Sequence, residues 1–222
     1  MEWGRAANDR TGFGTVAEVM PIVYVVDDDI SVRESLEALI RDLGWQPWVF
    51  ASAQDFLSHS RTAVPSCLVL DVSLPDLNGL DLQQRLATGR NDMPIIFITG
   101  YGDVPMTVRA MKAGAVEFLT KPFGDEALLD AIRSAIQRSA AALGHLADLQ
   151  ILGRRHASLS AREREVMALV VSGLMNKQVG GKLGISEITV KAHRGRVMRK
   201  MGATSLANLV NIAAKLGTSS RN

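Results

Sequence analysis

The chain has 222 residues, of which 47% are hydrophobic, which is enough for one large or two ordinary globular domains with packed cores. Its apolar stretches are short and interrupted by charges, and none approaches the roughly 18 residues needed to cross a bilayer. The first twenty residues also lack the apolar core of a signal peptide. We therefore expect a soluble cytoplasmic protein with no membrane partner.

The net charge of +2 hides opposite charges in two parts of the chain. Residues 1–140 contain 12 Lys and Arg against 19 Asp and Glu, a net charge of −7, whereas residues 141–222 contain 13 against 4, a net charge of +9. An acidic region attracts cations and a basic region attracts phosphate backbones. The two parts are therefore expected to bind different partners.

Residues 1–20 show no clear periodicity and are expected to be an extension without a defined fold. From residue 22 onward, short apolar runs alternate with amphipathic segments of helical length, the pattern of parallel strands joined by crossover helices. The expected strands cover 22–26, 47–50, 67–70, 95–98 and 116–119. All but the second are nearly wholly apolar, as strands covered on both faces must be. The second contains Pro47, which favours an edge position.

Five such units predict an α/β doubly wound parallel sheet, which places ligand groups beyond the carboxyl ends of its strands. The single cysteine, Cys67, lies within an apolar run. We expect it to be a buried, inert thiol with no disulfide or metal role.

After about Arg138 the pattern becomes entirely helical. Residues 139–157 are expected to form a linker that is helical for part of its length, because alanine favours helix and Gly144 weakens it. Four short helical segments follow at about 161–172, 176–183, 186–201 and 205–216. The predicted organisation is an extension at 1–20, an α/β domain at 21–138, the linker at 139–157, and an all-α domain at 158–217.

Polar residues gather where the expected strands end. They are Asp27, Asp28 and Asp29 after the first strand, Asp71 after the third, Thr99 after the fourth and Lys121 after the fifth. Clustered carboxylates repel one another unless a cation is present, so the pattern predicts a hard divalent ion, Mg²⁺. Magnesium and Lys121 could neutralise a phosphoryl group, which leaves one carboxylate as nucleophile and one hydroxyl to bond the product.

Two of these acids have simpler explanations. Asp71 could cap the turn that follows its strand. Asp29 is expected only to begin the next helix, because acids are favoured near helix amino termini.

Four separated motifs carry a family resemblance. They are VVDDD at 25–29, LD at 70–71 with LP at 74–75 and NGL at 78–80, ITG at 98–100, and KPF at 121–123. Together they resemble the receiver domains of two-component response regulators over about residues 20–140. The resemblance implies a flavodoxin-like strand order of 2-1-3-4-5 and a cis bond before Pro122.

The resemblance also implies the roles of single residues. It makes Asp71 the phosphorylated residue, and it gives Mg²⁺ the ligands Asp28, Asp71 and the backbone carbonyl of Ser73, with Asp27 acting through water. It further implies that Lys121 contacts the phosphoryl group and that Thr99 and Phe118 form a switch pair. Without the resemblance, Thr99 would be an ordinary residue at a strand end and Phe118 a core residue.

Residues 176–186 have the form of a helix, a turn containing glycine, and a second helix capped by Ser186, which is a helix-turn-helix signature. On the second helix, Val190, Val197 and Met201 share one face and are expected to pack inward. The outward face is expected to consist of Lys191, Ala192, Gly195, Arg196 and Arg199. Small residues within a cationic face allow a helix to approach a DNA groove closely. The alternative is a merely solvated basic helix.

With LSAREREV at 159–166 and SLANLV at 205–210, this region resembles the four-helix DNA-binding domain of the LuxR and NarL/FixJ families over about 158–216. The whole chain is similar to the FixJ-like subgroup through 99–106 and 110–115. The resemblance implies base contacts near Lys191, Ala192 and Gly195, and phosphate contacts from Lys177, Thr189, His193 and Arg196. His193 could equally pack at the edge of the core.

Three glycines depart from the family pattern. Gly180 and Gly181 stand within a helix, where each costs about 1 kcal/mol relative to alanine. Gly195 replaces a larger residue in the reading face. We expect these glycines to affect DNA affinity or specificity without changing the fold.

The sequence thus predicts a transcription regulator that a sensor histidine kinase phosphorylates on Asp71. Its expected partners are promoter DNA, RNA polymerase and, when phosphorylated, a second copy of itself that contacts residues 104–113 and 116–119. The receiver is expected to catalyse only its own phosphoryl transfer and dephosphorylation. Regulators of the FixJ-like subgroup usually activate transcription, although the residues here do not distinguish activation from repression.

The sequence opposes two rival functions. A receiver that controls an enzyme is opposed by the lack of a nucleophile, metal or phosphate-loop constellation after residue 140. A receiver that has become a phosphorylation-independent interaction module is opposed by its complete set of acidic residues.

Overall fold

The computed structural model describes residues 20–88 and 93–217. Nearly all of the expected amino-terminal extension therefore lies outside the described residues. The chain divides into two compact units, Met1–Ala141 and Ala142–Asn222.

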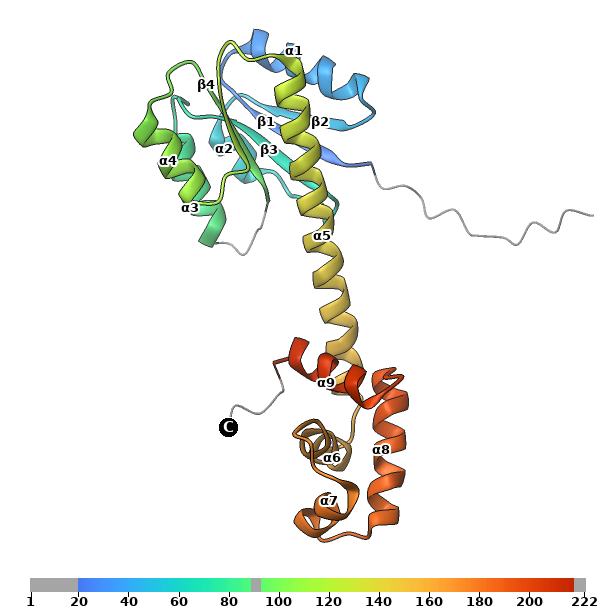
Figure 1. Ribbon diagram of the computed structural model, residues 1–222. Coiled ribbons are helices and arrows are strands. Elements are labelled where there is room, and N and C mark those ends of the chain that lie inside the picture. Colours follow the sequence, from blue (N-terminus) through green and yellow to red (C-terminus); the bar gives the residue numbers. More distant parts are fainter. Residues whose placement is uncertain (1–19, 89–92, 218–222) are drawn as a thin grey trace, which may run out of the picture. The chain divides into compact units, whose positions relative to one another are not determined.

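The first unit contains a five-stranded parallel sheet in the order β2-β1-β3-β4-β5 (Figure 1). Its strands are β1 (Ile22–Val26), β2 (Gln46–Phe50), β3 (Ser66–Asp71), β4 (Ile95–Thr99) and β5 (Glu117–Thr120). This order confirms the predicted one, and β2 lies at an edge as Pro47 indicated. β5 forms the other edge, where Phe118 and Leu119 pack partly against the two cores while Glu117 and Thr120 are exposed. This strand is therefore less buried than its apolar sequence predicted.

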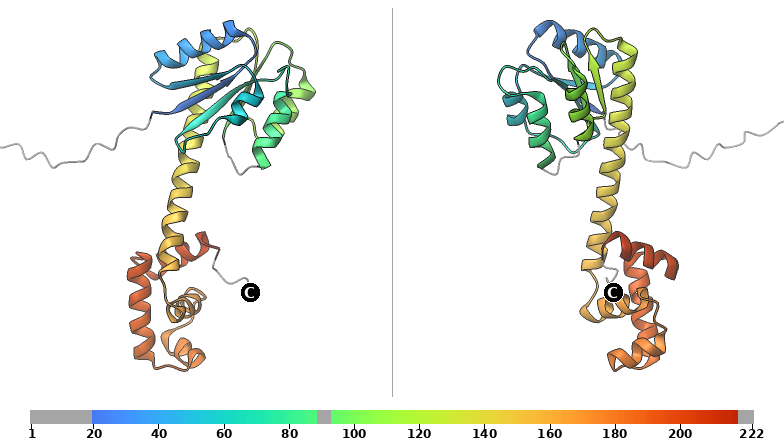
Figure 2. Two further views of the ribbon diagram at one scale, coloured as in Figure 1. Left: turned by 180° about the vertical axis from the view of Figure 1, so that it is seen from behind. Right: turned by 60° about the vertical axis from the view of Figure 1, so that its left-hand side comes forward.

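Helices cover both faces of this sheet, which confirms the doubly wound architecture (Figures 1 and 2). On one face lie α1 (Ile30–Asp42) and the amino-terminal part of α5 (Asp125–Ala157), and on the other lie α2 (Ala53–Ser58), α3 (Gly79–Thr88) and α4 (Val104–Lys112). Because successive strand residues point to opposite faces, each central strand supplies both cores. In β1, for example, Val25 packs on the α1 and α5 side and Tyr24 on the side of α2.

Cys67 in β3 is fully buried, and burial raises the pKa of its thiol. The thiolate is the reactive form, so burial disfavours reaction at this residue. The buried position confirms that part of the prediction. Residues 139–157 are helical throughout, because α5 extends to Ala157 despite Gly144 and Gly153.

The second unit contains α6 (Ala161–Val171), α7 (Asn176–Leu183), α8 (Glu187–Met201) and α9 (Leu206–Lys215). Serines cap three of them: the side chains of Ser160, Ser186 and Ser205 accept hydrogen bonds from backbone N–H groups of the first turns of α6, α8 and α9. Gly184 ends α7 with a φ of 65°, a conformation that glycine adopts without strain. This capped turn sets the direction in which α8 begins.

Candidate functional site

Three carboxylates meet at the carboxyl edge of the sheet. Asp27 and Asp28 directly follow β1, and Asp71 ends the neighbouring strand β3. Each offers an oxygen, and these oxygens lie within 4.8 Å of one another. Asp27 and Asp71 are buried, whereas Asp28 is exposed. A hard cation could thus reach the cluster from the solvent on the side of Asp28.

Lys121, which follows β5, brings a positive charge to this cluster. Its Nζ lies 2.6 Å from Oδ2 of Asp27 and 3.8 Å from Oδ2 of Asp71. The backbone N–H of Lys121 donates to the carbonyl of Thr99, which fixes the segment against the end of β4. The Lys121–Pro122 peptide bond is cis, as the resemblance implied. One ammonium offsets only part of the charge of three carboxylates.

Asp71 is the least satisfied of these acids. Burial raises the pKa of its carboxyl, Asp27 raises it further, and Lys121 opposes both effects. Its Oδ1 is buried and has no hydrogen-bond partner among the described residues. A buried acceptor without a partner is costly, so this oxygen is suited to receive a cation or a reacting group.

The backbone around Asp71 is tightly packed. A Cβ on Gly79 would lie 2.6 Å from the carbonyl oxygen of Asp71 and 3.0 Å from Cα of Val72. The N–H of Gly79 donates to the carbonyl of Val72. Only a residue without a Cβ therefore fits at position 79. This explains the glycine of the NGL motif, which the sequence alone did not explain.

Asp27 is held from two directions. Its Oδ1 accepts from the N–H of Asp29 at 2.9 Å, and its backbone carbonyl accepts from Arg33 at 2.7 Å. The side chain of Asp29 accepts from the N–H of Ser31 and caps α1, which confirms its predicted role. The sequence analysis did not predict this contact of Arg33. The sequence signal for it is the position of a cation about one helical turn after the acidic run.

The remaining predicted receiver residues lie nearby. Ser73 is exposed just after β3. Thr99 is fully buried at the end of β4, and its hydroxyl is within hydrogen-bond distance of both the carbonyl and the N–H of Tyr101. Phe118 in β5 is partly buried, and its ring packs against Phe97 with 6.1 Å between centroids. The hydroxyl of Thr99 is thus engaged with the following loop.

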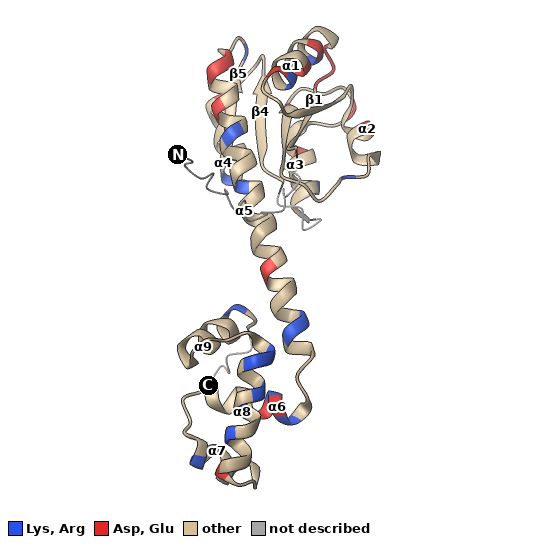
Figure 3. Ribbon diagram, turned by 90° about the vertical axis from the view of Figure 1, so that its right-hand side faces the viewer, with Lys and Arg blue, Asp and Glu red and all other residues tan. Residues whose placement is uncertain are grey.

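A second candidate site lies on α8, in the other unit. Val190, Val197 and Met201 are buried, as predicted for its inward face. The predicted outward residues Lys191, Ala192, Gly195, Arg196 and Arg199 are all exposed. Figure 3 shows several bands of Lys and Arg along α8. In the described part of the chain, no carboxylate pairs with Lys191, Arg196 or Arg199.

The other residues expected to meet phosphate have mixed positions. Lys177 is exposed in the first turn of α7. Thr189 is partly buried, and both its N–H and its hydroxyl interact with the capping Ser186. His193 is partly buried, and its Nδ1 is buried with no partner among the described residues. A partly buried side chain is compatible with both interpretations of His193, which are packing at the edge of the core and contact with a DNA phosphate.

The two glycines of α7 differ. A Cβ on Gly180 would lie 2.7 Å from the carbonyl oxygen of Ile185, whereas Gly181 has open space. The expectation that alanine would be better at both positions therefore fails at Gly180, because α7 must approach the start of α8 closely. Gly195 also has open space around it.

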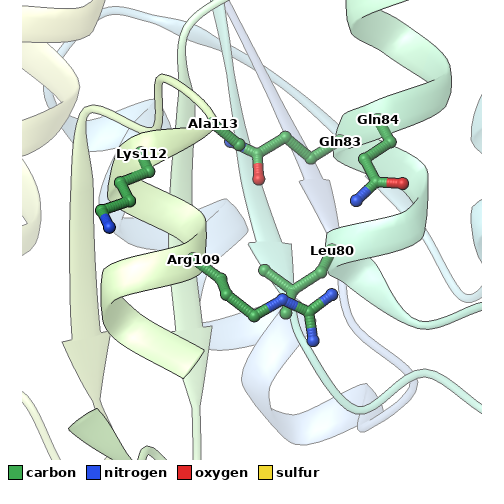
Figure 4. Close-up of a pocket in the computed structure, with 6 residues that line it drawn as sticks. All are labelled: Leu80, Gln83, Gln84, Arg109, Lys112 and Ala113. Atoms are coloured by element: carbon green, nitrogen blue, oxygen red, sulfur yellow. The ribbon is translucent and has the colours of Figure 1, made fainter. Parts of the chain in front are cut away.

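A hollow of about 310 Å³ lies between α3 and α4 (Figure 4). It is lined by Leu80, Gln83, Gln84, Arg109, Lys112 and Ala113. The Nε2 of the buried Gln83 donates to the carbonyl of Ala110 and so ties α3 to α4. None of the predicted site residues lines this hollow.

Comparison with known families matches both units. Residues 23–133 match the response regulator receiver domain, and residues 157–213 match the bacterial regulatory proteins of the luxR family. Nodulation protein W of Bradyrhizobium diazoefficiens is 51% identical over 94% of this chain and 92% of its own length. The transcriptional regulatory protein FixJ of the same organism is 42% identical over 88% and 95%. The solved structure of the response regulator StyR is 48% identical, with a TM-score of 0.80, and covers 88% of this chain and 99% of that one.

A receiver domain followed by a LuxR-type DNA-binding domain defines a two-component response regulator that controls transcription. The chain belongs to the NarL/FixJ family of these regulators. Its receiver implies a kinase as partner, and its second domain implies DNA binding. Within the described ranges, no helix is both long and apolar enough to span a membrane.

Proposed function

We propose that a sensor histidine kinase phosphorylates Asp71 and that this modification controls binding to promoter DNA. The observation that carries the proposal is the buried Oδ1 of Asp71, which has no partner in the described residues although Lys121 and two other acids surround the same carboxylate. In the reaction, an oxygen of Asp71 forms a bond to phosphorus while the phosphorus–nitrogen bond to the kinase histidine breaks and the imidazole leaves.

Mg²⁺ fits this site because its donors are hard oxygens. Asp28, Asp71 and the carbonyl of Ser73 would hold the ion, and Asp27 would act through water. When bound, the ion supplies charge neutralisation for the phosphoryl oxygens. Lys121 provides the second positive charge, and its contact with Asp27 keeps the ammonium beside Asp71. The receiver then catalyses only its own phosphoryl transfer and dephosphorylation.

Thr99 and Phe118 form the proposed switch. To bond a phosphoryl oxygen, the Thr99 hydroxyl must give up its interaction with Tyr101, which moves the loop after β4. Phe118 lies beside that loop, since its Cε1 would be 3.0 Å from a Cβ on Gly102. A shift of the loop therefore changes the space available to the Phe118 ring.

The exposed face of α8 is the proposed DNA-reading surface. Lys191, Ala192 and Gly195 would meet base edges, and Arg199 the backbone. Phosphate contacts are proposed for Lys177, Thr189, His193 and Arg196. Within the ranges that the structure describes, Lys191, Arg196 and Arg199 pair with no carboxylate. This supports the assignment, because phosphate contacts supply much of the affinity for DNA.

Phosphorylation is proposed to favour a homodimer through the α4–β5 face. Three large apolar side chains of α4 are exposed there: Val104 (77%), Val108 (43%) and Met111 (42%). Dimers suit two-fold operators with paired reading helices. We further propose a cytoplasmic activator that contacts RNA polymerase, with a receiver at 21–138, a linker at 139–157 and a DNA-binding domain at 158–217.

Labelling with a small-molecule acyl phosphate and magnesium tests the phosphoacceptor. The wild type should incorporate phosphate, Asp71→Asn should not, and Asp28→Ala should be strongly impaired because it removes a ligand of the ion. Asp81→Asn, which alters an exposed acid on α3, serves as the matched control and should label normally. Undiminished incorporation by Asp71→Asn would refute the assignment.

A further inference from the structure

Ile188 is an apolar side chain on a surface that is otherwise cationic or small. It is 83% exposed, and among the large hydrophobic side chains of the described residues only Tyr101 is more exposed. Single exposed apolar residues are common on proteins, so exposure alone says little. The position of Ile188 on α8, in line with the exposed cations, is a second and independent indication of a role.

Ile188 begins the row of exposed residues on α8. Lys191, Ala192, Gly195, Arg196 and Arg199 follow it at intervals of 3, 4, 7, 8 and 11 residues, which places them all on one side of a helix. Ile188 is the second residue of α8 and lies in its first turn, after the Ser186 cap and Glu187. In a helix-turn-helix protein, the amino-terminal residues of the second helix contact base edges in the major groove.

We propose that Ile188 contacts the C5-methyl group of a thymine and so makes one position of each half-site prefer a T·A pair. This inference rests on the proposed placement of α8 in the major groove. Isoleucine has no hydrogen-bond donor or acceptor with which to bind a phosphate or a polar base edge. Among the four bases, only thymine presents an apolar group in the major groove.

The surroundings of Ile188 favour DNA over an apolar protein partner. Lys191 and Arg196 on the same face have no carboxylate partner among the described residues, and phosphates would complement their charge. Ala192 follows one turn after Ile188 and extends a narrow apolar strip between these cations. The β-branched side chain is also restricted at χ1 within a helix, so it loses little freedom on contact.

The test uses full-length protein phosphorylated with an acyl phosphate. A duplex is first selected from random sequence, and each of its thymines is then replaced singly by uracil, which lacks the methyl group. The wild type should lose about three- to tenfold in affinity at one position per half-site. Ile188→Ala should show no loss at that position, whereas Ile188→Val should still show it.

Two further variants separate the possible outcomes. Met175→Ala removes another exposed apolar side chain, outside α8, and should keep the wild-type uracil profile. Lys191→Ala should bind more weakly and also keep that profile. If Lys191→Ala binds as tightly as the wild type, the placement of α8 is wrong and the inference fails with it. If Lys191→Ala is impaired but Ile188→Ala and the wild type have identical uracil profiles, only the Ile188 inference is overturned.

Discussion

At the scale of single residues, the cations of α8 divide into two groups. Lys200 donates to Glu163 at 2.7 Å, and Arg194 donates to Asn176, so both serve the packing of the second unit. Lys191, Arg196 and Arg199 are exposed, and the described residues offer them no carboxylate. The composition does not distinguish these five cations, although only the first group has hydrogen-bond partners within the described residues.

Within the second group, Lys191 and Arg199 should behave differently. Lys191→Ala should cost about 1–3 kcal/mol on the selected site and relax the preference at one or two base pairs, because we propose that its ammonium contacts a guanine edge. Arg199→Ala should weaken binding to selected and random duplexes alike and reduce the salt dependence by about one phosphate contact. Fluorescence anisotropy across a salt series measures both effects. Equal losses on both duplexes for Lys191→Ala would make it a phosphate contact.

Glu163 gives a pH-dependent prediction. The hydrogen bond from Lys200, together with that from the N–H of Ser160, lowers the pKa of Glu163 from its usual 4.5 to about 2. Because the folded pKa lies below the unfolded one, its stabilising contribution is present above pH 4.5 and is lost as the pH falls through about 2. Glu163→Gln should therefore destabilise the protein at neutral pH and flatten the acid side of its stability profile.

Thermal unfolding followed by circular dichroism over that pH range measures this effect. Glu165→Gln is the control, because Glu165 pairs with Arg162 at the exposed surface, where ion pairs contribute little. An acid profile of Glu163→Gln that parallels the wild type would contradict the role of the Lys200–Glu163 pair.

At the scale of elements, the ends of α8 are fixed by neighbours from distant parts of the second unit. Arg155, near the end of α5, donates to the carbonyl of Met201 at 3.2 Å, where α8 ends. Lys200 also donates to the carbonyl of Ser158. At the other end, the close approach of Gly180 to Ile185 sets where α8 starts. These contacts fix the orientation of α8 and of its exposed cationic face within the second unit.

Substitutions at the two glycines of α7 test this packing. Gly181→Ala should raise the free energy of unfolding by up to about 1 kcal/mol, because its surroundings are open and alanine is the better helix former. Gly180→Ala should lower it by about 1–3 kcal/mol, since its Cβ would overlap the carbonyl of Ile185. Urea unfolding measures both. A stabilising Gly180→Ala would show that α7 and α8 are not in close contact there.

The sequence predicted those features that depend on local pattern. The apolar runs predicted each strand to within a residue or two, and the Ser186 cap marked the start of α8. The positions after the strands brought Lys121 and Asp27 to the same edge of the sheet, but the sequence did not predict the direct contact between these residues, which lie 94 positions apart. The partial exposure of β5 and the need for glycine at position 180 also depend on tertiary packing, which the local sequence pattern does not specify.

At the scale of the whole molecule, the two domains carry separate sites, as the opposite charges of the two parts of the chain indicated. The receiver carries the acidic cluster, and the exposed cations of α8 lie in the basic part. Magnesium and phosphate would act at the first site and DNA at the second. Control of one by the other requires a change that phosphorylation produces outside its own site, and dimerisation is the proposed one.

Sedimentation of the phosphorylated and unphosphorylated protein tests dimerisation. We expect phosphorylation to shift the protein toward a dimer, and Val104→Glu to keep it monomeric by placing a charge on the exposed apolar surface of α4. Ile30→Glu, at an exposed position on α1 across the sheet, should dimerise normally. Equal monomer fractions for both forms at all accessible concentrations would remove dimerisation as the switch.

The central claim is that the phosphoryl group on Asp71 controls DNA binding. Its most direct test is the affinity of the wild type and of Asp71→Asn for the selected duplex, each measured with and without an acyl phosphate and magnesium. We predict that the phosphodonor tightens binding by the wild type and leaves Asp71→Asn at its basal affinity. An equal gain in affinity for Asp71→Asn, or no gain for a wild type that is demonstrably phosphorylated, would contradict the claim.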